Sequence, residues 1–186
     1  MKIDHKIKTM WLIDSNGQAL SRVLVEYRYF VHRFTQWFAM VIGRAEDQHV
    51  RQLLLPNLVD ELGGPDKAPS HLDLLDRCLS SCGIRQRDVN RLLPSTREAE
   101  AWFYEVCSNR NTHTSLCVLG PGTESISQSF LAPLEKAIKR VFSEKHLDLV
   151  YFDVHRPEVE SAHADSIDKA IRIVESNAPP QKRKSL

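Results

Sequence analysis

The feature that most constrains the fold is the recurrence of apolar residues at helical spacing along most of the chain. Between about Leu20 and Gly43 such residues recur every three or four positions, the period of one helix face. They are Val23, Tyr27, Phe30, Phe34, Trp37, Phe38 and Val41. Similar patterns predict helices at about 46–62, 70–82, 123–142 and 157–174, and another after Pro94-Ser95-Thr96. With only seven glycines, this argues for an all-α bundle of six or seven helices.

Local signals predict where several of these helices begin and end. Ser70 is expected to cap a helix whose third position is the acidic residue Asp73. Gly63-Gly64-Pro65 is expected to end the preceding helix, and Pro56 to kink it. The segment Thr114–Leu119 has strand propensity, but it is isolated and is predicted to be helical. Gly120-Pro-Gly122 is expected to break the chain. Trp102 and Val106 are expected on the apolar face of their helix.

Composition indicates an ordinary globular domain. Hydrophobic residues make up 42% and charged residues 26% of the chain, and the net charge is +1. We therefore expect one helical domain over residues 1–176, a flexible polar tail at 177–186, and neither nucleic acid nor a membrane as partner. No apolar run approaches the ~20 residues that span a bilayer, and no secretory signal is evident. The spacing of Cys78, Cys82, Cys107 and Cys117 indicates buried thiols in a reducing cytosol, hence a cytoplasmic protein.

Residues 151–163 carry the strongest chemical signal. Two imidazoles and two carboxylates, from His155, Glu158, Glu160 and His163, surround the expected start of a helix at Pro157. Glu160 and His163 are three residues apart and share one helix face, while His155 lies just ahead of the helix and can fold back towards them. Such oxygen and nitrogen donors bind iron, manganese or zinc. The alternative is a charged, solvated helix start with a stray histidine.

Further donors interrupt the apolar stripes of other helices. Glu61 follows Leu54 and Leu58 at three- and four-residue steps, His71 opens the next helix after a returning loop, and Glu124 follows the glycine break. Taken singly, each is as well explained as a solvated surface residue. Four other charged residues are expected to be ordinary surface charges: Asp60, Asp73, Glu135 and His146.

The order of these donors and their surroundings resembles a known family. Asn57-Leu-Val-Asp-Glu61-Leu-Gly-Gly64, a histidine opening the next helix, Glu124 after Gly-x-Gly, and Tyr-Phe-x-x-His155 before Glu160-x-x-His163 resemble the haem-oxygenase-like di-iron oxidases and oxygenases. That fold also contains thiaminase II and pyrroloquinoline quinone synthase. The resemblance, which covers about residues 30–173, implies a haem-oxygenase-like bundle of about seven helices that binds two Fe(II) ions and uses dioxygen. The metal ligands it implies are Glu61, His71, Glu124, His155, Glu160 and His163.

The chain also departs from the family pattern. The late motif of the family reads His-x3-Asp-x2-His, whereas here it is His155-x4-Glu160-x2-His163, and Glu158 is a rival to Glu160. Some relatives add a carboxylate from an earlier helix, but the comparable stretch Thr35-Gln36-Trp37 has none. The chain is short for the family, so its N-terminal helix is expected to be missing or reduced.

The resemblance implies an enzyme that oxidises a small molecule, with iron doing the difficult chemistry and the protein shaping the pocket. Phe34, Trp37 and Phe38 are predicted to line that pocket, although aromatic residues at helical spacing also make plain core. Two alternatives stay open: a metal-independent oxidase or hydrolase, in which Cys107 or Cys117 would be the nucleophile, and a non-catalytic partner protein. A homodimer is possible.

Overall fold

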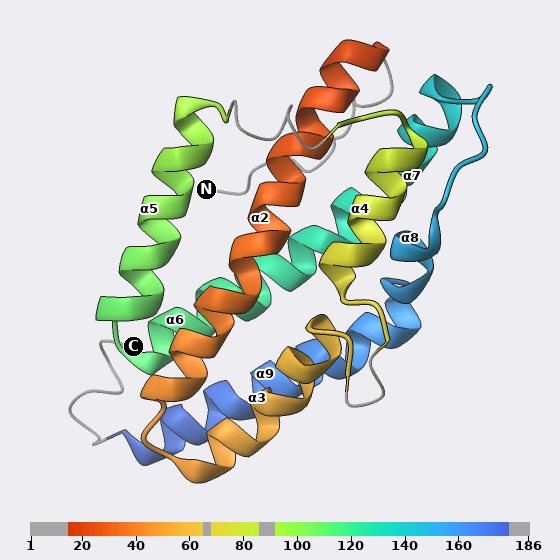
Figure 1. The fold of residues 1–186 in the computed structure, drawn as a ribbon. Helices are drawn as coiled ribbons and strands as arrows, with labels where there is room; N and C mark the ends of the chain where they lie inside the picture. Colours follow the sequence, from red (N-terminus) through yellow and green to blue (C-terminus); the bar gives the residue numbers. More distant parts are fainter. Residues whose placement is uncertain (1–14, 65–67, 86–91, 179–186) are drawn as a thin grey trace.

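The computed structural model describes residues 15–64, 68–85 and 92–178, without the side chains of 124–128 and 157–161. Within these ranges every regular element is a helix, which confirms the all-α prediction (Figure 1). The elements are α2 (Gly17–Arg44), α3 (Gln48–Glu61), α4 (His71–Ser81), α5 (Pro94–Asn109), α6 (Thr112–Leu119), the π-helical turn η2 (Gly120–Glu124), α7 (Ser125–Val141), α8 (Val150–Val154) and α9 (Pro157–Asn177).

The long helix α2 is the central column of the bundle. Its N-cap is Asn16, whose side chain accepts a hydrogen bond from the Ala19 amide and so satisfies one of the free N–H groups of the first turn. It packs against α3, α4, α5, α6 and α7, and in Figure 1 it runs diagonally through the molecule. Its predicted apolar stripe is inward-facing, since Trp37, Phe38 and Val41 are each 1% exposed.

The core has two halves that share α2. The first half of α2 packs with α4, α7 and α8 around Leu24, Leu75, Leu134 and Ile138. The second half packs with α3, α5, α6 and α9, in a cluster that contains Trp37, Phe38, Leu54, Leu116, Leu119 and Ile167. After α2 the chain therefore passes from one half to the other four times: from α3 to α4, from α4 to α5, from α6 through η2 to α7, and from α8 to α9. Every metal ligand implied by the resemblance lies at or within two turns of one of these crossings.

The expected break at Gly120-Pro-Gly122 is wrong. The chain stays helical through η2, a π-helical turn that joins α6 directly to α7. A Cβ atom on Gly120 would lie 2.5 Å from Cγ2 of Ile167, so the glycine allows this turn to pack closely on α9. Within this wider turn, the Thr123 hydroxyl donates a hydrogen bond to the Leu119 carbonyl and so satisfies that acceptor.

Two surface assignments also need correction. Trp102 is 52% exposed; its neighbour Phe103 faces the core instead and stacks on Trp37 with ring centroids 4.7 Å apart. Glu135 is only 7% exposed, on a helix that packs against α8 and α9. There its carboxylate pairs with Lys139 at 2.6 Å and Arg156 at 3.6 Å.

Other boundaries agree with the sequence signals or lie outside the described residues. Pro56 is accommodated inside α3, and Ser70 and Asp73 form a reciprocal capping box at the start of α4. The short helix α8 was not predicted. The expected tail is described only as far as residue 178, and residues 1–14, where a reduced N-terminal helix was expected, are not described. No helix among the described residues is long and apolar enough to cross a membrane.

Candidate metal centre

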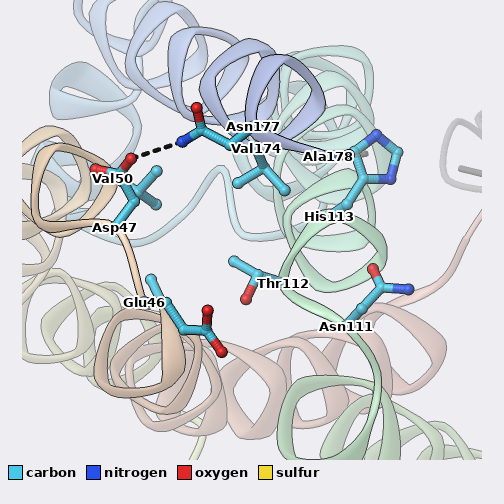
Figure 2. Close-up of a pocket in the computed structure, with 10 residues that line it drawn as sticks. Glu46, Asp47, Val50, Asn111, Thr112, His113, Val174, Asn177 and Ala178 are labelled. Atoms are coloured by element: carbon cyan, nitrogen blue, oxygen red, sulfur yellow. Dashed lines mark hydrogen bonds between the residues drawn. The ribbon is translucent and has the colours of Figure 1, made fainter. Parts of the chain in front are cut away.

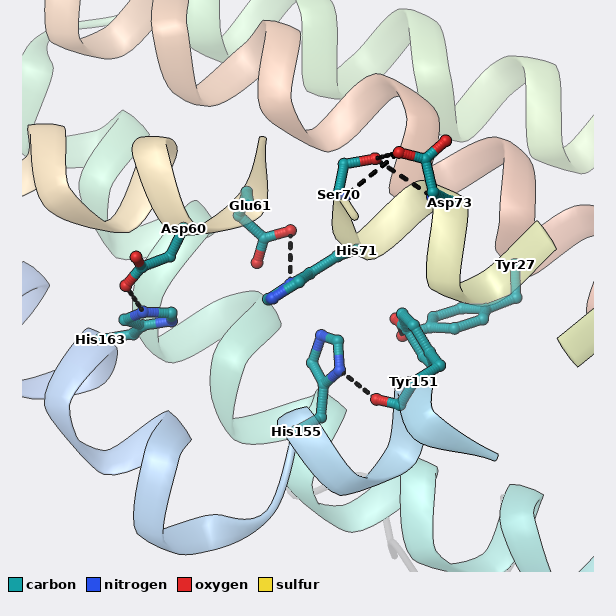
Figure 3. A network of polar contacts seen from close by, with 9 residues as sticks. All are labelled: Tyr27, Asp60, Glu61, Ser70, His71, Asp73, Tyr151, His155 and His163. Atoms are coloured by element: carbon teal, nitrogen blue, oxygen red, sulfur yellow. Dashed lines mark hydrogen bonds and ion pairs between the residues drawn. The ribbon is translucent and has the colours of Figure 1, made fainter. Parts of the chain in front are cut away.

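Glu61, His71 and His155 converge where the two halves of the core meet. Glu61 ends α3, His71 begins α4 and His155 follows α8. Each can offer one ligand atom, and the three atoms lie within 4.8 Å of one another. Oε2 of Glu61 lies 3.0 Å from Nδ1 of His71, and the rings of His71 and His155 have centroids 4.5 Å apart (Figure 3). The side chains of Glu61 and His71 are each 11% exposed, so this donor set is largely shielded from water.

The turn after α3 returns the chain so that His71 meets Glu61. Gly63 and Gly64 have φ angles of 98° and 68°, the left-handed region that glycine adopts without cost. A Cβ atom on Gly63 would collide with the carbonyl oxygen of Ala68. Ser70 then caps α4 and places His71 at its first helical position. The glycine pair and the capping box therefore position this ligand.

His155 is oriented by the backbone of Tyr151. Its Nδ1 lies 2.6 Å from the Tyr151 carbonyl oxygen, which can only accept a hydrogen bond, so Nδ1 carries the proton. In the neutral imidazole the lone pair is then on Nε2, which points towards Glu61 and His71 in Figure 3. Such a second hydrogen bond is the usual way to orient a metal-binding imidazole. Tyr151 itself is 1% exposed, and its hydroxyl lies 2.7 Å from that of Tyr27.

A second carboxylate–imidazole pair lies beside the first. Nε2 of His163, on α9, is 3.2 Å from Oδ2 of Asp60, on α3. Asn57, one turn earlier on α3, donates to the backbone carbonyl of His163 at 3.1 Å. Asp60 was expected to be an ordinary surface charge, and its side chain is indeed 60% exposed; in addition it contacts the predicted ligand His163.

The structure thus brings together part of the predicted ligand set. Glu61, His71 and His155 form one cluster, and His163 faces Asp60 next to it. Glu124 ends η2, and Glu158 and Glu160 lie in the first turn of α9, but their side chains are outside the described residues. Their roles stay predictions. Asp60 and Tyr151 were missed; the helical four-residue step from Tyr151 to His155 was the one available signal.

A pocket of about 650 Å³ opens next to the Glu61–His71 and Asp60–His163 pairs. Its lining includes Asp60, His71 and His163, with Leu74, Val150 and Val154 as apolar walls and Arg77 as a cation. Phe34, Trp37 and Phe38, the predicted pocket residues, instead pack with Phe30 and Phe103 in the second half of the core. That they line a substrate pocket remains a prediction.

Another pocket, of about 570 Å³, lies at the opposite end of α3 (Figure 2). Asp47 accepts a hydrogen bond from Asn177 there at 2.8 Å, and the pKa of Asp47 is lowered, chiefly by the His49 backbone amide. His113 lies on its wall and pairs with Glu175 at 3.0 Å. A helix the length of α3 separates this pocket from Glu61 by on the order of 20 Å. This pocket is therefore remote from the Glu61–His71 and Asp60–His163 pairs.

Cys107 and Cys117, the two candidate nucleophiles, do not have the lowered pKa of a reactive thiol. All four are free thiols, and Cys78, Cys82 and Cys107 are buried. Burial raises the pKa of Cys107 to about 11, and burial with the nearby Glu175 and Asp168 raises the pKa of Cys117. A reactive cysteine needs a lowered pKa, because the thiolate is the nucleophile. These values disfavour the thiaminase-like alternative.

The donor set fits iron. Carboxylate and imidazole ligands with open positions suit ferrous iron, whereas a site for Mg²⁺ or Ca²⁺ would be built from oxygen alone. Within the described residues, Glu61, His71 and His155 meet this requirement in a shielded position, and the Tyr151 carbonyl holds one imidazole in the tautomer that presents Nε2. Asp60 and His163 offer the same chemistry alongside.

Comparison with known proteins gives two kinds of relative. A protein of Chlamydia trachomatis named 4-aminobenzoate synthase is 25% identical, and the match covers 84% of this chain and 63% of that protein. A protein of the same name from Chlamydia pneumoniae is 22% identical, and the match covers 96% of this chain and 79% of that protein. The chain thus spans less than two thirds of the first relative. The crystal structure of a TenA homolog from Pseudomonas syringae superposes with a TM-score of 0.68 at 15% identity, covering 91% of this chain and 71% of that one. This confirms the haem-oxygenase-like fold.

A family model described as iron-containing redox enzymes matches residues 21–185. The match therefore includes α3, α4, α8 and α9, which carry the described carboxylate and imidazole donors. An enzyme of this kind is an oxidoreductase, and the donor set of this chain suits the metal that the description names. On the length of that match, the chain belongs to the iron-containing redox enzyme family.

Proposed function

We propose that this protein is an iron-dependent oxidase or oxygenase that uses dioxygen to oxidise a small molecule. The observation that carries the proposal is the convergence of Glu61, His71 and His155 within 4.8 Å. When bound, iron would supply the electrons that activate dioxygen, and two ions are proposed because the predicted ligand set is large enough for both. The protein would hold the metal, bind the substrate and exclude water.

Each described residue has a defined task in this proposal. Glu61 would bind iron and offset its positive charge, while His71 and His155 would bind it through neutral imidazole nitrogens. The Tyr151 carbonyl would keep the His155 proton on Nδ1 throughout turnover. Leu74, Val150 and Val154 would cover the apolar part of the substrate in the adjoining pocket.

The same pocket suggests the class of substrate. Arg77 lies on its wall, and a guanidinium binds carboxylates well. The relatives named 4-aminobenzoate synthase point the same way, because 4-aminobenzoate combines an aromatic ring with a carboxylate. We propose that this chain handles a small aromatic carboxylate, with 4-aminobenzoate as the first product to look for.

Anaerobic reconstitution tests the proposal. Protein loaded with Fe(II) and mixed with dioxygen, a reductant and candidate small aromatic carboxylates should consume oxygen. The oxidised products, 4-aminobenzoate among them, are followed by liquid chromatography and mass spectrometry. His155→Ala should lose bound iron and oxygen consumption. His49→Ala is the matched control, since the His49 side chain is 80% exposed and should change neither.

Two outcomes would contradict the proposal. Activity retained in excess chelator would favour the metal-independent oxidase or hydrolase. A stable complex with another protein, together with only trace iron in elemental analysis, would favour the non-catalytic partner.

A further inference from the structure

Adjacent carboxylates at the end of α3 each face a different imidazole. Glu61 pairs with His71 at 3.0 Å, and Asp60 pairs with His163 at 3.2 Å. Figure 3 shows the two pairs next to each other, and Asp60, His71 and His163 line the same pocket. Two consecutive residues of α3 therefore provide the carboxylates that contact His71 and His163.

The Asp60–His163 contact is poorly explained as a stabilising ion pair. The Asp60 side chain is 60% exposed, and ion pairs with an exposed member contribute little to stability. The His163 ring, in contrast, is only 8% exposed, and Asn57 fixes its backbone from the same helix. A buried imidazole held against a carboxylate in a pocket beside iron ligands is an arrangement in which both groups can bind one ion.

Charge balance supports a further carboxylate in this place. Two ferrous ions carry four positive charges, whereas the predicted carboxylates Glu61, Glu124 and Glu160 would supply three negative ones. The early-helix carboxylate of some relatives is missing, because the comparable stretch here is Thr35-Gln36-Trp37. Asp60 would supply the fourth negative charge from a different helix.

We propose that Asp60 is an additional metal ligand, binding a second iron together with His163. This rests on the proposed function. In this arrangement Glu61 and Asp60 divide the end of α3 between the two ions, with His71 and His155 on one side and His163 on the other.

Metal binding itself tests this without using activity. Wild-type protein should bind two equivalents of Fe(II) in an anaerobic titration, and Co(II) should give visible absorption from both. Asp60→Asn should weaken the affinity for one Fe(II) equivalent by at least about tenfold and leave the affinity for the other unchanged. Asp60→Glu should partly restore it. Asp165→Asn, an exposed aspartate on α9, is the matched control and should bind like wild type.

The outcomes separate this inference from the proposed function. Wild type that takes up no iron overturns both. Iron uptake by wild type that Asp60→Asn leaves unchanged in number and affinity overturns the role of Asp60 alone. A variant that weakens all binding in parallel with a lowered melting temperature also overturns it, because Asp60 is then only structural.

Discussion

At the scale of single residues, the centre depends on neighbouring groups that bind no metal. His155 is directed by the Tyr151 carbonyl, and His71 by the capping box of Ser70 and Asp73 that starts its helix. In both cases a residue close in the sequence positions the imidazole. A ligand can thus be lost through a neighbour that does not touch it.

Ser70→Ala tests this for His71. Loss of the cap should lower the free energy of unfolding by about 1 kcal/mol and weaken iron binding. Ser108→Ala is the control, because that hydroxyl only donates to a carbonyl in its own helix. Urea denaturation and Fe(II) titration measure the two effects. Unchanged values for both would show that the cap does not position His71.

The pH dependence of the same cap has a defined sign. Hydrogen bonds from Ser70 lower the pKa of Asp73 in the folded protein. Its contribution to stability is therefore fully present above the unfolded pKa of about 3.9 and is lost as the pH falls through the lower folded value. The difference between wild type and Asp73→Asn should be constant near pH 7 and shrink in acid. Urea denaturation at several pH values measures it, and a difference that grows in acid would contradict it.

At the scale of elements, the π-helical turn η2 takes the chain from one core half to the other. It contacts α9 closely at Gly120 and ends at Glu124, a predicted ligand. Because a π turn is wider than an α turn, it changes which residues of α7 face α9. The turn is thus a positioning element rather than a loop.

Gly120→Ala should destabilise the protein by about 1–3 kcal/mol, because the new methyl group would overlap Ile167. Gly43→Ala is a matched control in helix α2, where a Cβ atom would meet no atom within 4 Å. It should be neutral or stabilise by about 0.5–1 kcal/mol. Chemical denaturation of both variants measures this, and equal stabilities would mean that α9 can move away from η2.

At the scale of the whole molecule, the described donors come from three separate parts of the chain. Glu61 belongs to α3, His71 to α4, and His155 to the link between α8 and α9, so a bound ion would connect both halves of the core. Because unfolding separates these groups, a metal that binds them stabilises the folded state. The free energy of unfolding should therefore rise when the centre binds iron.

Anaerobic Fe(II) at a hundred times its dissociation constant should raise the free energy of unfolding by about 2.7 kcal/mol. Chelator should reverse this increase. Mg²⁺ should raise the free energy of unfolding little, because imidazole ligands do not suit that ion. Thermal denaturation with and without metal measures this. His155→Ala should abolish the increase and His49→Ala should keep it; the same increase in both variants would place the binding elsewhere.

The local parts of this architecture could be read from the sequence. Helical periodicity, the Ser70–Asp73 cap, Pro157 at a helix start and the turn at Gly63-Gly64 all depend on residues within a few positions of one another. The meeting of Glu61 with His71 belongs to this class, since one short turn joins them. The resemblance to a family added the remaining ligands, of which His155 lies with the first two.

Only the tertiary structure decided which helix faces meet. The burial of Glu135, the exposure of Trp102, the π turn at Gly120 and the pairing of Asp60 with His163 each depend on contacts between segments far apart in the chain. Asp60 and Glu61 are neighbours with nearly the same side chain, and nothing local distinguishes the histidine that each would face. The reason is physical: periodicity determines that a helix has an apolar face, whereas the packing of the whole core determines what lies opposite its polar residues.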